Sequence, residues 1–272
     1  MKEAPSKVPQ TEVKPSAKTS PKRTFLIVAL MMIWVFCSVV ASQLLLGYLM
    51  LWILGGETIT QPVWNGVYSV LSYALALVLI IFVPPRVNAK WKLTYTKKGR
   101  QVKTSGSKAS APITREQIGL SGTPTWTDIG LAPIAYIVGT LFAALLMLLF
   151  SLFPWFNPEQ LQETGFTAYM SGGEKVIAFV VLVVLAPAIE EIIFRGWLYG
   201  KLRARINMPL SIILTSLLFA VMHFQWNVGV NVFALSVVLC VLREITGTIY
   251  AGILTHMIKN GVAFYLLYVL GM

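Results

Sequence analysis

Three polar clusters interrupt the most apolar stretches of the chain, and they hold both of its histidines. The clusters are Glu190-Glu191-Ile-Ile-Phe-Arg195, Phe219-Ala-Val-Met-His223 and His256-Met-Ile-Lys-Asn260. Ionisable groups inside a membrane cost roughly 2.5–3.5 kcal/mol each on insertion scales, so they mark a functional site by default. Three such clusters on three helices predict one buried reaction centre.

The first cluster contains two carboxylates with different expected surroundings. Residues four apart share a face of an α-helix, so Glu191 and Arg195 can pair, which lowers the cost of burying both. Glu190 points about 100° away from that face and has no local partner. Such a carboxylate can act as a general base or acid. Glu190 is therefore the catalytic candidate, and the alternative is a structural ion pair with a contact to lipid headgroups.

Each histidine cluster has a chemical and a structural interpretation. His256 and Asn260 share a helical face and offer two hydrogen-bond donors, as an oxyanion hole requires. Their alternative role is hydrogen bonding between membrane helices. His223 taken alone is more often a core histidine than a ligand, and Phe219 on the same face can pack against the site. Taken together the clusters favour chemistry, because both histidines and the only Glu-Glu pair of the chain fall in apolar segments.

The composition identifies an integral membrane protein. The chain has 272 residues, of which 56% are hydrophobic and 12% charged, whereas a soluble domain carries about 25% charged residues. Several apolar stretches reach the ~20 residues of a spanning helix and lack the alternation of a membrane β-barrel. We predict an all-α polytopic bundle of about seven spans, with the catalytic centre between spans four, five and seven. The predicted spans are 25–54, 63–83, 129–153, 176–199, 208–224, 229–242 and 247–270.

The positive charge predicts the orientation of the chain. Of its 22 Lys and Arg, 18 lie in the segments 1–23, 84–115 and 201–205. The positive-inside rule explains this clustering more simply than a nucleic-acid partner, which we do not expect. Contact with anionic lipid is a weaker alternative. The N-terminus is then cytoplasmic, and an odd number of spans places Met272 outside. The sixth span is the weakest, and if it only re-enters the membrane, the C-terminus moves inside.

Four segments are predicted along the chain. Residues 1–23 form a disordered basic tail without a cleaved signal, and residues 24–83 form an N-terminal transmembrane pair. Residues 84–128 form a basic cytoplasmic loop that begins at Pro84-Pro85 and contains a short capped turn at 114–117. Residues 129–272 form the core that carries the three motifs.

The ordered set of motifs resembles that of the CPBP (CAAX protease and bacteriocin-processing, Abi) intramembrane proteases. This family includes the eukaryotic CAAX prenyl endopeptidase and the bacterial Abi and lysostaphin-resistance-like proteins. The matching motifs are Glu190-Glu191-x-x-x-Arg195, Phe219-x-x-x-His223 and His256-x-x-x-Asn260. Each motif is loose alone, but the ordered triple is specific, and the likeness covers about residues 115–272.

The resemblance implies a role for each motif residue. Glu190 and His223 would activate a water, His256 and Asn260 would stabilise the tetrahedral oxyanion, and Glu191 and Arg195 would support the site.

The family has been described both as metalloproteases and as glutamic proteases. The chain has no His-Glu-x-x-His motif, yet Glu190, His223 and His256 could ligate a zinc with an open fourth position. We favour the metal-free route. Lys259, beside Asn260, has no assigned partner and could pair with a carboxylate.

These features favour an intramembrane endopeptidase that hydrolyses a peptide bond in a membrane-associated protein or peptide, with or without a lipid anchor. Water attacks directly, because neither Ser nor Cys sits in a motif. The first alternative is a non-catalytic membrane scaffold, or an immunity or partner-binding protein with a degenerate site. A proton-coupled transporter ranks last, because the chain has no internal repeat. The compact chain without a retention tail favours a prokaryotic plasma membrane.

Overall fold

All regular structure in the described part of the chain is helical, which confirms the all-α prediction. The computed structural model describes residues 20–55, 62–91, 114–159, 165–167 and 169–271, with the backbone alone for 84–91. The elements are α1 (Pro21–Ile53), α2 (Pro62–Trp91), the 3-10 helix η1 (Glu116–Ile118), α3 (Trp126–Phe150), α4 (Gly172–Phe179), the π-helix η2 (Val180–Leu185), α5 (Ala186–Glu191), the π-helix η3 (Ile192–Leu198), α6 (Tyr199–Arg203), α7 (Met208–Val221), α8 (Trp226–Thr246), α9 (Tyr250–Phe264) and the π-helix η4 (Tyr265–Leu270).

Within the described residues, six stretches of helix are long and apolar enough to cross a membrane, so the protein is an integral membrane protein. They are Pro21–Ile53, Pro62–Val83, Trp126–Phe150, Gly172–Arg203, Trp226–Thr246 and Tyr250–Leu270. The fourth is one continuous helix built from α4, η2, α5, η3 and α6.

The shorter helix α7 connects α6 to α8. Glu244, near the end of α8, accepts hydrogen bonds from Tyr199 (2.7 Å) and Arg203 (3.1 Å) of α6. At the other end of α8, Trp226 contacts Trp155, which follows α3, with ring centroids 5.7 Å apart. The chain therefore runs from Arg203 to Trp226 through α7, which is apolar but shorter than the six candidate spans.

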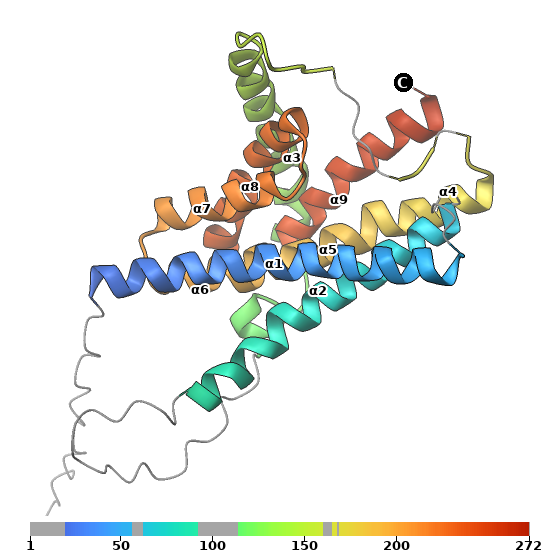
Figure 1. Cartoon of the computed structure of the whole chain (residues 1–272). Coiled ribbons are helices and arrows are strands. Elements are labelled where there is room, and N and C mark those ends of the chain that lie inside the picture. Colours follow the sequence, from blue (N-terminus) through green and yellow to red (C-terminus); the bar gives the residue numbers. More distant parts are fainter. Residues whose placement is uncertain (1–19, 56–61, 92–113, 160–164, 168, 272) are drawn as a thin grey trace, which may run out of the picture.

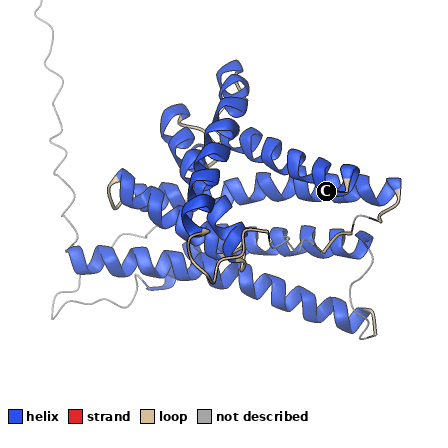
Figure 2. Ribbon diagram, turned by 90° about the horizontal axis from the view of Figure 1, so that it is seen from above, coloured by secondary structure: helices blue, strands red, loops and turns tan. Residues whose placement is uncertain are grey.

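We call the end of the bundle that carries Arg203 the basic end. α9 begins near this end, where Tyr250 donates a 2.9 Å hydrogen bond to the carbonyl of Gly122. It finishes beside the segment that precedes α4, where Phe264 and Tyr268 pack with Phe166 and Met170. In Figure 1, α1 and α2 lie beside the long helix, and α3, α7, α8 and α9 lie on its other side. Figure 2 shows these helices from above.

The lengths of two helices differ from the prediction. α7 has only 14 residues, or about 21 Å at 1.5 Å per residue, whereas α8, predicted to be the weak span 229–242, has 21 residues. The charged pair Arg243-Glu244 marked a span end in the sequence. The helix continues through it because Glu244 finds its partners on α6.

α2 also extends beyond its predicted end at residue 83. The backbone stays helical through Pro84-Pro85 as far as Trp91, although the apolar spanning part ends at Val83. Proline is tolerated in membrane helices when the freed backbone groups find other partners. The predicted loop therefore begins after Trp91.

Two π-helical segments flank the Glu-Glu pair of the long helix. η2 precedes α5 and η3 follows it, and Pro187 occupies the first turn of α5. π-helical segments are rare and are frequently found at functional sites. Here they change the directions in which the side chains before and after Glu190 and Glu191 point, relative to those of a continuous α-helix.

The segment before α3 packs against the basic end of the long helix. A Cβ at Gly196 would lie 2.7 Å from the carbonyl oxygen of Ile118, so only glycine allows η1 to approach this closely. Ile249 donates a 3.0 Å backbone hydrogen bond to Gly119, whose φ of 75° also favours glycine. The predicted capped turn at Thr114–Gln117 is present, with reciprocal bonds of 3.3 and 3.4 Å.

Candidate active site

Glu191, Arg195 and His256 form a closed polar network inside the bundle. Arg195 Nη1 donates to Glu191 Oε1 at 2.7 Å, and His256 Nδ1 lies 3.0 Å from the same oxygen. All three side chains are buried. The expected pair between Glu191 and Arg195 is present even though η3 begins between them. The network joins the long helix to α9 at one point.

Glycine at position 252 allows α9 to approach this network. A Cβ on Gly252 would lie 3.1 Å from Glu191 Oε2, which is closer than ordinary van der Waals contact. The position of the Glu191 carboxylate therefore depends on the absence of a side chain one turn before His256.

Phe219 forms the apolar wall between the two histidines. Its ring is 1% exposed, and its centroid lies 5.0 Å from that of His223 and 5.9 Å from that of His256. Arg195 Cζ lies 4.5 Å from the same ring, in cation–π geometry. This contact partly offsets the burial of the guanidinium.

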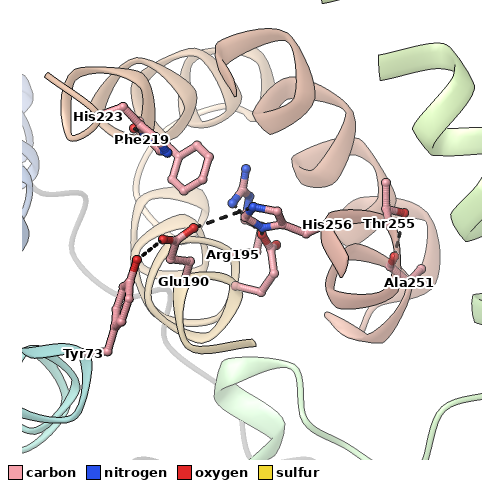
Figure 3. Close-up of polar contacts among 9 residues, drawn as sticks. Tyr73, Glu190, Arg195, Phe219, His223, Ala251, Thr255 and His256 are labelled. Atoms are coloured by element: carbon pink, nitrogen blue, oxygen red, sulfur yellow. Dashed lines mark hydrogen bonds and ion pairs between the residues drawn. The ribbon is translucent and has the colours of Figure 1, made fainter. Parts of the chain in front are cut away.

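Glu190 faces a cavity instead of the closed network. Tyr73 of α2 donates a 2.6 Å hydrogen bond to Glu190 Oε1, and His256 Nε2 lies 3.7 Å from Glu190 Oε2. The Glu190 side chain is 14% exposed, whereas that of its neighbour Glu191 is fully buried. Figure 3 shows Glu190 between Tyr73 and His256, with His223 and Phe219 across from it.

His223 is oriented by the backbone of its own helix. Its Nδ1 lies 2.8 Å from the carbonyl oxygen of Phe219. A carbonyl only accepts, so Nδ1 carries the proton and Nε2 carries the lone pair of the neutral ring. The next residue, Phe224, has a φ of 54°, a conformation that costs a bulky residue about 1–3 kcal/mol. The site thus includes a strained turn between α7 and α8.

Asn260 is already engaged by the long helix. Its Nδ2 donates a 2.8 Å hydrogen bond to the carbonyl of Leu182 in η2, so one of its two N–H groups remains for another acceptor. Lys259 makes no hydrogen bond or ion pair with the described residues. Its charge interacts with Glu190 and His223 at longer range.

One cavity brings the predicted catalytic residues together. It has a volume of about 410 Å³, and its polar lining includes Tyr73, Glu190, His223, His256, Lys259 and Asn260. The long helix, α7 and α9 thus contribute to one space, which α1, α2 and α8 also line. Glu191 and Arg195 do not line it; they lie behind it in the closed network.

The fit of a metal can be tested on the ligand geometry. In the part of the chain that the structure describes, no group of three or more His, Cys, Asp or Glu side chains is arranged to hold a metal ion. Both ring nitrogens of His256 face carboxylates instead. Glu190, His223 and His256 therefore do not fit the three-ligand zinc site considered above.

Tyr73 is the polar contact of Glu190 that the sequence motifs did not identify. A tyrosine within a span is commonly an interface anchor, and α2 lies outside the motif-bearing region. The available signal was a polar stripe at helical spacing on α2, made of Asn65, Ser69, Ser72 and Tyr73. Such a stripe on an apolar helix indicates a face turned toward other polar groups.

Comparison with known proteins agrees with the motif set. The family described as type II CAAX prenyl endopeptidase Rce1-like matches residues 172–262, about a third of the chain. A search of the curated proteins found no match, and a search of the solved structures found none either. The matched segment holds all seven motif residues, whereas Tyr73 lies outside it. The predicted resemblance is therefore confirmed over residues 172–262, where the chain matches the Rce1-like family of CAAX intramembrane proteases.

Proposed function

We propose that this protein is an intramembrane endopeptidase that hydrolyses a peptide bond of a membrane-associated protein or peptide. The observation that carries the proposal is the single cavity lined by Glu190, His223, His256 and Asn260. A carboxylate, a neutral imidazole and two hydrogen-bond donors are the groups that water-mediated amide hydrolysis requires.

In this mechanism Glu190 and His223 activate the attacking water, and Glu190 is the general base that takes its proton. Tyr73 occupies Glu190 Oε1, which leaves Oε2 to take a proton from a water in the cavity. The water oxygen forms a bond to the substrate carbonyl carbon. Glu190 then delivers this proton to the leaving nitrogen as the C–N bond breaks, and the products are an amine and a carboxylic acid, which loses its remaining proton to solvent.

His256 and Asn260 would donate to the oxyanion of the tetrahedral intermediate. His256 Nδ1 is fixed by Glu191, so its Nε2 is the atom turned toward the cavity side, and it donates when the ring carries both protons. Asn260 offers its second amide N–H. Donors that are held in place before the reaction need no reorganisation as charge develops, which is the basis of oxyanion stabilisation.

The mechanism uses no metal, and this can be tested directly. Because the described residues offer no three-ligand set, we expect cleavage to continue unchanged after dialysis against a strong chelator. A loss of activity that zinc restores would contradict the proposed mechanism.

The function itself is tested with purified protein in proteoliposomes and membrane-anchored peptides, with and without a prenyl group. We expect one new peptide terminus, identified by mass spectrometry, and no cleavage by Glu190→Gln protein. The matched control is Glu174→Gln, because Glu174 lies in the capping turn of α4 and outside the cavity. Equal cleavage by wild-type and Glu190→Gln protein would overturn the catalytic assignment.

A further inference from the structure

Lys259 is a charged side chain of the cavity that the proposed mechanism does not use. It lies in the middle of the candidate span Tyr250–Leu270, about 13 Å of helix or more from either end. Lysines near the ends of membrane helices extend their ammonium groups to the interface. A lysine in mid-span is costly to bury and by default marks a functional site. The position of Lys259 therefore calls for an anionic partner.

The protein itself does not supply that partner in the described residues. Lys259 is half-buried and lines the catalytic cavity, but it makes no hydrogen bond or ion pair with any described residue. Among the described residues of the lining, Glu190 is the one carboxylate. Its Oε1 accepts a hydrogen bond from Tyr73 at 2.6 Å, and its charge reaches Lys259 only at longer range. The ammonium group is thus available to an anion that enters the cavity.

The place of Lys259 on α9 sets what such an anion would belong to. Residues three or four apart on a helix are neighbours, with Cβ atoms about 5–6 Å apart. Lys259 follows His256 by three residues and immediately precedes Asn260, and all three line the cavity. A lysine on its four-carbon stem can therefore reach a group close to the carbonyl that the two oxyanion donors would hold. Since an ammonium group only donates, the complementary group of a peptide is a carboxylate.

We propose that Lys259 is a substrate-binding residue that selects peptides with a carboxylate close to the scissile bond. The carboxylate belongs either to the C-terminus of the peptide or to an aspartate or glutamate side chain, because both present the same acceptor oxygens. The inference rests on the proposed endopeptidase function for the cut itself, whereas carboxylate binding stands on the cavity and on Lys259. Charge-assisted hydrogen bonds are strong where water is largely excluded, so a neutral amide is a poor substitute.

Binding is measured with the full chain carrying Glu190→Gln, so that no probe is cut, by calorimetry in nanodiscs of zwitterionic lipid. The probes are N-palmitoylated tetra-alanine with a free C-terminus, its C-terminal amide, and the amide in which aspartate replaces the last alanine. We expect one carboxylate probe or both to bind about tenfold or more tightly than the neutral amide. The tighter of the two identifies the source of the carboxylate. The preference should vanish when Lys259→Met is added.

Two further variants separate binding from folding. Lys259→Arg keeps the charge and should retain the preference, and Lys175→Met is the matched control, because Lys175 of α4 lies outside the cavity. The thermal midpoint of Lys259→Met should not fall below that of the wild type, since the change removes a buried charge without an ion-pair partner. Equal binding of the three probes, binding of none, or a preference that survives Lys259→Met would overturn the proposal.

Cleavage assays distinguish this inference from the endopeptidase function. With a peptide that is cut in proteoliposomes, we expect Lys259→Met to lower kcat/KM about tenfold for the carboxylate form and to leave the amide form unchanged. An equal fall of kcat for both forms would place Lys259 among the oxyanion donors and disprove its role in selection. A carboxylate preference in binding without cleavage of any peptide would disprove the endopeptidase function and leave the binding site intact.

Discussion

Two adjacent carboxylates lie in two different regions of this protein. Glu191 is fully buried and shares one oxygen with Arg195 and His256, whereas Glu190 is partly exposed to the cavity and receives a hydrogen bond from Tyr73. The closed network is built from the long helix and α9 alone. The cavity is also lined by α1, α2, α7 and α8. Neighbours in sequence are thereby divided into a structural member and a reactive one.

The difference between the two regions lies in what the second oxygen of each carboxylate faces. Glu191 Oε1 contacts Arg195 and His256, and Glu191 Oε2 is buried away from the cavity without a hydrogen-bond partner among the described residues, so this carboxylate has no contact with water in the cavity. A carboxylate with one oxygen held and the other facing a cavity can exchange a proton with water. Substitutions in the two regions should therefore fail in different ways.

The largest effect on turnover is expected for Glu190→Gln. The amide keeps the shape and can still accept from Tyr73, but it cannot take a proton, so kcat should fall about 10²–10⁴-fold. The thermal midpoint in detergent should stay close to that of the wild type. Loss of folding together with activity would mean that Glu190 belongs to the structural network.

Glu191→Gln should instead destabilise the protein. Removing one partner of a buried ion pair costs about 3–5 kcal/mol, because Arg195 is left uncompensated. We expect a clearly lower thermal midpoint, and activity lost in proportion to the folded fraction. A variant that melts like the wild type but turns over slowly would erase the proposed distinction between the two carboxylates.

Tyr73→Phe removes one hydrogen bond to the reactive carboxylate and nothing else. Hydrogen bonds to charged groups contribute about 1.5–3 kcal/mol, so kcat should fall roughly tenfold or more while KM changes little. Tyr68→Phe is the matched control, because Tyr68 lines the same cavity from the same helix but donates to the carbonyl of Gln43. Equal effects of the two substitutions on kcat would show that the hydrogen bond from Tyr73 to Glu190 has no role in catalysis.

Gly252→Ala probes how closely α9 must approach Glu191. The added methyl would lie 3.1 Å from Glu191 Oε2, and overpacking of this kind typically costs about 1–3 kcal/mol. Gly261→Ala on the same helix is the control, because its Cβ would lie 3.6 Å from Val183 Cγ1, an ordinary contact. The thermal midpoint of Gly252→Ala should be lower than that of Gly261→Ala. Identical midpoints would show that the network tolerates a shift of the Glu191 carboxylate.

Local sequence features were sufficient to predict the part of the site that lies on single helices. The Glu191–Arg195 pair follows from i, i+4 spacing, and the separation of Glu190 from that pair follows from the same helical geometry. The apolar length of the spans predicted the all-α membrane fold, because a bilayer core leaves few alternatives to helices. The match at residues 172–262 agrees with the motif order.

Contacts between helices could not be predicted from local sequence features. The length of α8 depended on partners for Glu244 on α6, and both nitrogens of His256 face carboxylates of the long helix. The bond between Asn260 and Leu182 joins residues that are 78 positions apart. No periodicity within one helix encodes such pairings.

The sequence by itself determined which residues could carry charge into the membrane and which helices would hold them, because both depend on local composition and helical period. Only the tertiary structure decided which carboxylate is closed off and which one faces a cavity. These depend on how separate helices pack against one another, and packing joins side chains that no local pattern places together.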